Sequence, residues 1–257
     1  MGSCRADTLR IGGFVDTSTV DWYGNVSLVV FFAGCNFRCP YCQNASLIPL
    51  DSGRTVGLQL LKERVDANQT LLDSVVFTGG EPLMQPAPLL EAAKIVKDFK
   101  LKLMLNTNGS VPEVVEKIVE EDLLDRLALD VKAPLTTDDY GRVAGLPHLG
   151  VELATSVNET LNICNKKNID VEVRTTVAPS LSDDPDFIKS IATSIRGRCD
   201  AYYLQQFDNS GDILDPAFKK VSPPSKDELI SLARVAIDVG VRDVYVKTRE
   251  SGLQRIG

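Results

Sequence analysis

Three closely spaced cysteines are the residues of this sequence best suited to carry chemistry. Cys35, Cys39 and Cys42 lie in the run FAGCNFRCPYCQN, with the spacing Cys-x3-Cys-x2-Cys and with Tyr41 just before the last of them. Cysteine thiolates are the usual ligands of iron–sulfur clusters. Because the loop is short, it can bring three thiolates to one point. There they can hold three corners of a cubic cluster and leave the fourth iron open for a small molecule.

A zinc knuckle or a disulfide pair are the alternative interpretations of the cysteine loop. Structural zinc sites usually have four ligands, often arranged as two close pairs. No fourth cysteine or histidine lies near the loop, and the single histidine, His148, is more than a hundred positions away. The spacing therefore favours an iron–sulfur cluster.

The segment CNFRCPYC resembles the signature of the radical S-adenosylmethionine (SAM) superfamily. The resemblance implies a [4Fe–4S] cluster and SAM as cofactors, with Cys35, Cys39 and Cys42 as cluster ligands and catalytic residues. In that superfamily the open iron chelates the amino and carboxylate groups of SAM, and one electron cleaves SAM to a 5′-deoxyadenosyl radical that abstracts hydrogen from the substrate. Tyr41 would then line the adenine, and Asn44 would contact SAM or cap the following segment.

Composition narrows the class of protein. A chain of 257 residues with 44% hydrophobic residues has the size and core of one α/β barrel. The net charge of −7 argues against a nucleic-acid partner, because phosphate binding needs a basic surface. The start of the chain carries no apolar signal run, and no stretch approaches the roughly 20 apolar residues that span a bilayer. We therefore expect no membrane contact and a location in the reducing cytoplasm.

Apolar runs alternate with helical patterns along the chain, which predicts a parallel sheet. No repeat or linker divides the chain. With the resemblance, this predicts a single-domain α/β fold: a partial or near-complete parallel (β/α) barrel of the radical SAM type over residues 27–257. An N-terminal extension over residues 1–26 would pack on the barrel. The expected strands cover residues 27–33, 74–78, 101–106, 126–131, 170–177, 201–205 and 243–246, and the expected helices cover residues 58–68, 86–99, 111–121, 152–168, 184–196 and 226–239.

Polar residues follow the expected strands at their C-terminal ends, where parallel sheets and barrels place their chemistry. After the strand that ends at Thr78 come Gly79, Gly80 and Glu81. Glycine permits a positive φ and a close backbone approach, which a plain strand-to-helix turn would also use. The run resembles the GGEP motif of the radical SAM superfamily, which implies that these three residues bind the amino group of SAM.

The next two strands end in Asn106-Thr107-Asn108-Gly109 and in Asp130-Val131-Lys132. Asn-Gly is a turn signal by itself. Asp130 and Lys132 share one side of a strand, where they can form an ion pair. Both segments resemble those of activating enzymes of glycyl-radical enzymes. That resemblance implies that Asn106, Thr107 and Asp130 lie beside SAM and that Lys132 is a cation for its carboxylate. The activating enzymes often carry Asp where this chain has Asn106. A metal-cation site beside SAM would therefore have one negative charge fewer here than in those enzymes.

Two further polar residues lie in the later strands. Arg174 is costly to bury unless it is paired, so we expect either a carboxylate partner or a role in binding SAM or a peptide. Gln206 follows Gln205 at a strand end where the activating enzymes carry polar groups near the adenosyl moiety, which implies a SAM contact. Cys4 is given no role. Cys164 and Cys199 are expected to be buried thiols, and His148 to lie at the surface.

The opening IGGFVDTSTVDWYGNVSLVVFFAGCNFRCPYCQN resembles the activases of anaerobic ribonucleotide reductase and of pyruvate formate-lyase. The resemblance implies an enzyme that generates a glycyl radical on a partner, expected to be the anaerobic ribonucleoside-triphosphate reductase. An external one-electron reductant such as flavodoxin or ferredoxin would serve it. One alternative is a radical SAM enzyme acting on a different peptide, a small molecule or an RNA base. The other is a non-catalytic metal-binding or electron-transfer protein, with Cys164 or Cys199 as a fourth ligand.

Overall fold

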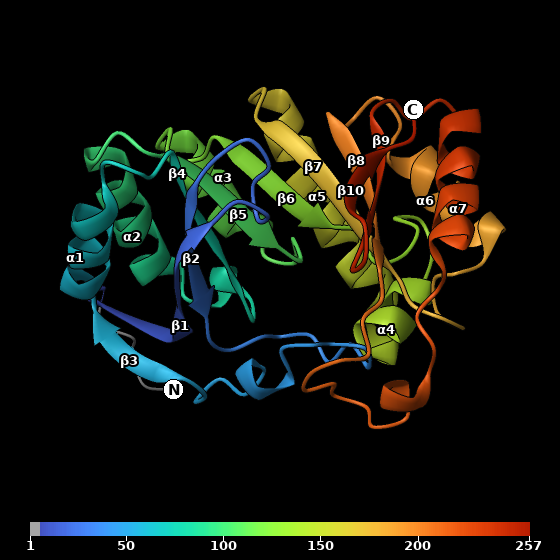
Figure 1. Ribbon diagram of the computed structural model, residues 1–257, viewed down its shortest axis with the longest axis horizontal. Coiled ribbons are helices and arrows are strands. Elements are labelled where there is room, and N and C mark those ends of the chain that lie inside the picture. Colours follow the sequence, from blue (N-terminus) through green and yellow to red (C-terminus); the bar gives the residue numbers. More distant parts are fainter. Residues whose placement is uncertain (1–5) are drawn as a thin grey trace. The chain divides into compact units, whose positions relative to one another are not determined.

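The computed structural model describes residues 6–257 (Figure 1). Cys4 and the first five residues of the predicted N-terminal extension lie outside the described residues. The chain forms two compact units. The first contains the chain up to Asn36 with Ser46–Thr107 and Val111–Leu127, and the second contains Phe37–Ala45, Asn108–Ser110 and Ala128–Gly257.

The described part of the first unit is built on five strands in the order β5-β4-β2-β1-β3. Strands β2, β4 and β5 run parallel, whereas β1 is antiparallel to both β2 and β3. The parallel strands are continuous apolar runs, as expected for strands buried on both faces. The elements are β1 (Thr8–Ser18), β2 (Ser27–Phe32), β3 (Arg54–Gly57), β4 (Ser74–Gly79), β5 (Lys102–Thr107), α1 (Leu58–Asn68), α2 (Pro86–Asp98), α3 (Pro112–Glu120) and the 3₁₀ turn η2 (Pro82–Met84).

The second unit has three parallel strands, β7, β8 and β9, and β10 pairs with β9 antiparallel. In Figure 1, α6 and α7 lie beside β8 and β9. Strand β6 (Arg126–Asp130) begins in the first unit and ends in the second. The other elements are α4 (Asp139–Ala144), α5 (Gly150–Lys166), β7 (Asp170–Val177), α6 (Pro185–Ile195), β8 (Ala201–Gln206), α7 (Lys226–Asp238), β9 (Val244–Thr248), β10 (Gly252–Arg255) and the 3₁₀ turns η1 (Ala45–Leu47), η3 (Pro147–Leu149) and η4 (Phe218–Lys220).

The predicted alternation of parallel strands and helices is confirmed, with ends that differ by at most two residues. Four short or irregular elements were not predicted: β1, β3, α4 and β10. Within residues 6–257, no helix combines the length and the apolar character needed to cross a bilayer.

Candidate functional site

The cysteine loop leaves the C-terminal end of β2. In the first unit, the Gly34 N–H donates to the Leu47 carbonyl at 2.7 Å and the Cys35 N–H donates to the Ile48 carbonyl at 3.0 Å. Cys35 is therefore held by backbone bonds to the segment that follows the loop in sequence. Its side chain is partly exposed.

The second half of the loop, with Cys39 and Cys42, belongs to the second unit. The Cys42 N–H donates to the Cys39 carbonyl at 3.0 Å, which closes a tight turn. Two distant segments of the chain hold this turn from outside. Their bonds run from the Arg38 N–H to the Ala144 carbonyl (2.9 Å), from the Leu214 N–H to the Cys42 carbonyl (3.1 Å) and from the Asp215 N–H to the Pro40 carbonyl (2.9 Å), and Asn44 forms a β-bridge with Asp212.

Burial disfavours the charged form of both thiols in this turn. It raises the pKa of Cys39 to about 11, and Lys132 is the largest opposing influence. Burial also raises the pKa of Cys42, against which the Asn44 backbone N–H and Lys132 act. Tyr41, between them, is almost fully buried. Since the thiolate is the form that binds metal, metal binding here must release protons and depends on nearby positive charge.

The glycine pair packs the β4–η2 turn against the cysteine loop within the first unit. The Gly80 N–H donates to the Phe32 carbonyl and the Glu81 N–H to the Gly34 carbonyl, both at 2.8 Å. A Cβ on Gly79 would lie 2.3 Å from the Phe32 carbonyl oxygen, and a Cβ on Gly80 would lie 2.4 Å from that of Gly34. Close backbone packing is thus sufficient reason for glycine at both positions.

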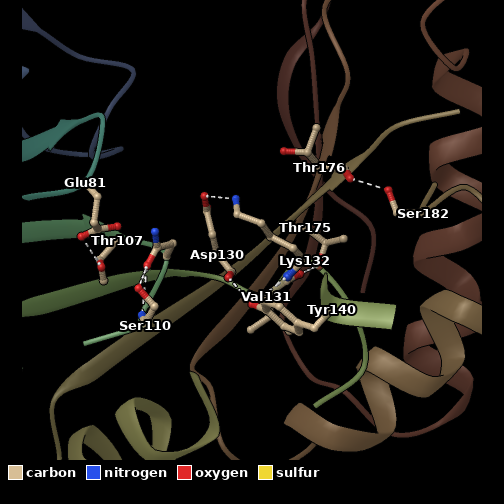
Figure 2. A network of polar contacts seen from close by, with 11 residues as sticks. Glu81, Thr107, Ser110, Asp130, Val131, Lys132, Tyr140, Thr175, Thr176 and Ser182 are labelled. Atoms are coloured by element: carbon tan, nitrogen blue, oxygen red, sulfur yellow. Dashed lines mark hydrogen bonds and ion pairs between the residues drawn. The ribbon is translucent and has the colours of Figure 1, made fainter. Parts of the chain in front are cut away.

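Glu81 is buried and is joined to the end of β5 (Figure 2). Its Oε1 accepts a hydrogen bond from the Thr107 hydroxyl at 2.7 Å and another from the Leu83 N–H at 3.0 Å. The neighbouring Asn106 has a buried Oδ1 with no hydrogen-bond partner. A buried acceptor without a donor is unusual in folded proteins, so this oxygen is suited to receive a donor from a ligand.

The predicted Asn-Gly turn is confirmed in the second unit. Gly109 has a φ of +69°, and the Asn108 Oδ1 accepts hydrogen bonds from the Ser110 N–H and hydroxyl at 2.9 and 2.6 Å. The Thr160 hydroxyl donates to the Gly109 carbonyl at 2.8 Å, which ties the turn to α5.

Asp130 and Lys132 form the ion pair that their spacing allows, with 2.8 Å between Lys132 Nζ and Asp130 Oδ2 (Figure 2). The Lys132 side chain is 11% exposed and that of Asp130 is 41% exposed. Burial alone would lower the pKa of Lys132, but Asp130, Tyr41 and Cys39 outweigh it and hold that pKa well above its usual value. Lys132 is therefore a permanently charged ammonium beside the Cys39–Cys42 turn.

Arg174 has the carboxylate partner that its burial requires. Its Nε lies 2.5 Å from Glu172 Oε1, and the two side chains are 11% and 3% exposed. Register places Arg174 beside Tyr203 on β8, whereas Gln206 lies on the opposite face of that strand. Gln206 donates to the Pro224 carbonyl and accepts from the Arg249 N–H at 2.8 and 2.9 Å. The structure does not bring Gln206 to the face that carries Arg174.

Cys164 is buried in α5 and His148 is exposed, as expected, whereas Cys199, which was expected to be buried, is half-buried. Within residues 6–257, no three His, Cys, Asp or Glu side chains are grouped closely enough to hold one metal ion. In a cubic cluster each cysteine binds a different iron, so this observation concerns mononuclear sites such as zinc.

The sequence profile of the radical SAM superfamily matches residues 29–191. The chain belongs to this superfamily. The match begins in β2 and ends in α6, so it includes the cysteine loop, the glycine pair and the ends of β4 to β7.

Individual relatives narrow the group within the superfamily. The chain is 34% identical over 226 residues, 88% of its length and 91% of the other chain, to a protein of Methanocaldococcus jannaschii named as a glycyl-radical enzyme activating enzyme. It is 27% identical to the pyruvate formate-lyase-activating enzyme of Clostridium pasteurianum, over 73% of this chain and 76% of that one. This protein is thus a radical SAM enzyme of the glycyl-radical-enzyme activating group.

Solved structures confirm the α/β fold of the radical SAM type. A radical SAM methyltransferase from Sphaerobacter thermophilus superposes with a TM-score of 0.69 at 14% identity, and covers 88% of this chain and 67% of its own. At this level of identity the likeness concerns the fold alone.

Radical SAM enzymes use a [4Fe–4S] cluster and SAM, and the residues present fit both. Three thiols in one loop are the donor set for such a cluster. The buried Oδ1 of Asn106 can accept a hydrogen bond from an ammonium group such as that of SAM. Lys132 supplies a positive charge that favours the thiolate form of Cys39 and Cys42 and can pair with a carboxylate.

Reasoning from the sequence missed two residues that shape this region. Glu172 pairs with Arg174 at i, i+2 on the same strand, a spacing that was visible in the sequence. Tyr140 is fully buried and touches the backbone of Asp130 and Lys132, and nothing in its spacing marks it.

Proposed function

We propose that this radical SAM enzyme generates a glycyl radical on a partner enzyme, and that the partner is the anaerobic ribonucleoside-triphosphate reductase. The observation that carries the proposal is the 34% identity over 88% of the chain to a protein named as a glycyl-radical enzyme activating enzyme. The choice of the reductase rests on the resemblance of the segment before and through the cysteine loop.

Each site residue has a role in this proposal. Cys35, Cys39 and Cys42 hold the cluster, and Lys132 pairs with the carboxylate of SAM. When bound, the cluster and SAM together supply one-electron cleavage of SAM and hydrogen abstraction from the substrate. The turn at Glu81 orients the amino group, and the remaining contacts to SAM come from Tyr41, Asn44, Gly79, Gly80, Asn106, Thr107, Asp130 and Arg174. Gln206, on the opposite face of β8, is left out of this set.

The proposal places the enzyme in the cytoplasm, where an external donor such as flavodoxin or ferredoxin supplies one electron for each cleavage. Support comes from the thiol chemistry of the loop, since a reducing compartment keeps such cysteines available for iron.

The test uses anaerobically reconstituted enzyme, dithionite, SAM and the reductase labelled with glycine deuterated at Cα. We expect 5′-deoxyadenosine that carries deuterium. The same reaction with unlabelled reductase should give a glycyl-radical doublet in electron paramagnetic resonance, because the hydrogen that remains on Cα splits the signal. Cys42→Ala should abolish both products and the cluster. Cys199→Ala, which removes a half-buried thiol outside the loop, should retain them.

Two outcomes would contradict parts of the proposal. Deoxyadenosine without a doublet, and without deuterium, would exclude the reductase as partner and point to another peptide, a small molecule or an RNA base. Retained SAM cleavage in Cys42→Ala would overturn the assignment of the cluster ligands.

A further inference from the structure

One buried tyrosine hydroxyl forms hydrogen bonds with the backbone of both Asp130 and Lys132. Tyr140, in the first turn of α4, is fully buried. Its hydroxyl donates to the Asp130 carbonyl at 3.1 Å and accepts from the Lys132 N–H at 3.2 Å (Figure 2). A tyrosine hydroxyl has one hydrogen to donate, and here it is used on backbone.

The residue between them, Val131, is held from the other side by β7. Its N–H donates to the Arg174 carbonyl at 2.9 Å, and its carbonyl accepts from the Thr175 hydroxyl at 2.7 Å. The buried Tyr202 hydroxyl in turn donates to the Thr175 hydroxyl at 3.0 Å. The Asp130 carbonyl, both polar groups of Val131 and the Lys132 N–H therefore all have a bonding partner.

Packing alone does not explain a tyrosine at position 140. The segment runs past the end of β6 at Asp130, where regular strand pairing stops. A phenylalanine at position 140 would fill nearly the same volume, yet the buried hydroxyl carries a desolvation cost that only its two backbone bonds offset. Those bonds fix the two positions from which the charged side chains of Asp130 and Lys132 leave the chain.

We propose that Tyr140 is a positioning residue for Lys132, and that its hydroxyl sets the place of the Lys132 ammonium at which the carboxylate of SAM is recognised. This inference rests on the proposed function, in which Lys132 receives that carboxylate. Thr175 on β7 has the same positioning role, because its hydroxyl holds the Val131 carbonyl between the two charged residues. A flexible lysine that must be ordered on binding loses affinity, whereas a lysine held in place beforehand does not.

The experiment compares two ligands that differ in the methionine part. S-adenosylhomocysteine carries the carboxylate and the neighbouring amino group, and 5′-methylthioadenosine lacks both. Binding to the reconstituted, unreduced holoenzyme is measured by equilibrium dialysis for wild type, Tyr140→Phe and Ser182→Ala. Ser182 is a matched control, because its buried hydroxyl also donates to one carbonyl, of Thr176 at 2.7 Å, and accepts from one N–H, of Ala178 at 2.9 Å.

We expect Tyr140→Phe to bind S-adenosylhomocysteine about tenfold more weakly, a factor that corresponds to ~1.4 kcal/mol, while its affinity for methylthioadenosine stays within about twofold. Ser182→Ala should bind both ligands as wild type does. Thr175→Val should show the same selective loss, which keeps the proposal testable if Tyr140→Phe does not fold.

Equal weakening of both ligands in Tyr140→Phe, or no weakening, would overturn the positioning role. Wild type that binds the two ligands equally would overturn carboxylate recognition, and the positioning role with it. These outcomes are separate from failure of the proposed function, which would appear as wild-type SAM cleavage without a glycyl radical on the reductase.

Discussion

Gly80→Ala is predicted to unfold the first unit more easily and to displace the start of the cysteine loop. A Cβ at this position would lie 2.4 Å from the Gly34 carbonyl oxygen and 3.0 Å from that of Leu47. Both contacts are backbone atoms, so no side-chain rotation can relieve them. The Gly34 oxygen must move by at least 0.6 Å to restore the 3.0 Å that Cβ atoms keep.

The cost can be worked from these contacts. Overpacking of a tight site costs about 1–3 kcal/mol. The shift also strains the bond from the Glu81 N–H to the Gly34 carbonyl, which is worth roughly 1 kcal/mol. We therefore expect a loss of about 2–4 kcal/mol in the free energy of unfolding. Because Gly34 directly precedes Cys35, iron incorporation should fall as well.

The assay is urea unfolding of the reduced apoprotein, together with the iron-to-protein ratio after reconstitution. Gly13→Ala is the matched control: Gly13 lies in β1 of the same unit, and a Cβ there would meet nothing within 4 Å. Alanine in a strand is favoured over glycine by roughly 0.5–1 kcal/mol, so this variant should be at least as stable as wild type. The reasoning is refuted if Gly80→Ala and Gly13→Ala unfold at the same urea concentration and load the same iron.

Other variants probe the second unit. Gly145→Ala should reduce iron loading, measured after reconstitution, because Gly145 has a φ of +71° and its Cβ would lie 2.0 Å from the Arg38 carbonyl oxygen next to the cysteine turn. Glu172→Gln should lower the free energy of unfolding by about 3–5 kcal/mol in a denaturant titration, since it leaves the buried charge of Arg174 without its carboxylate; an unchanged midpoint would contradict this. Burial raises the pKa of Cys164 from 9.0 to about 12, so the unfolded chain loses that proton first and stability falls as pH rises above 9. Between pH 8 and 10, wild-type apoprotein should lose about 1.4 kcal/mol more unfolding free energy than Cys164→Ala, and equal losses would refute the burial effect.

The parallel strands could be predicted because they are buried on both faces and read as unbroken apolar runs. Strand β1 could not, since its burial alternates irregularly, it contains Gly12 and Gly13, and its pairing with β2 shifts register twice. Strand β3 has four residues and no fully buried one, so it carries no hydrophobic signal. Helix α4 and strand β10 span only six and four residues, too few for a period to be recognised.

The residues of the site also divide into those that the sequence predicts and those that it does not. In each unit, the predicted strand ends located polar residues of the candidate site: Glu81 and Thr107 in the first unit, and Asp130 and Lys132 in the second. The Asp130–Lys132 pair follows from its i, i+2 spacing. The bonds of Thr107 to Glu81 and of Thr175 to the Val131 carbonyl depend instead on packing between segments far apart in sequence, which spacing does not reveal. The division into an extension over residues 1–26 and a barrel over residues 27–257 stays a prediction, as do the individual contacts to SAM.

The charge at Lys132 links the cysteines of the motif to the hydroxyl residues Tyr140 and Thr175, which no motif marks. Burial makes the thiols of Cys39 and Cys42 harder to ionise, and Lys132 is the positive charge that opposes this in both cases. Its effect depends on distance, since an electrostatic interaction in a poorly solvated site changes steeply with separation. The position of that charge follows from backbone bonds to Tyr140 and Thr175, two uncharged residues on neighbouring elements. The cysteine motif therefore supplies the reactive thiols. The hydroxyls of Tyr140 and Thr175, which belong to no motif, determine the position of the Lys132 charge.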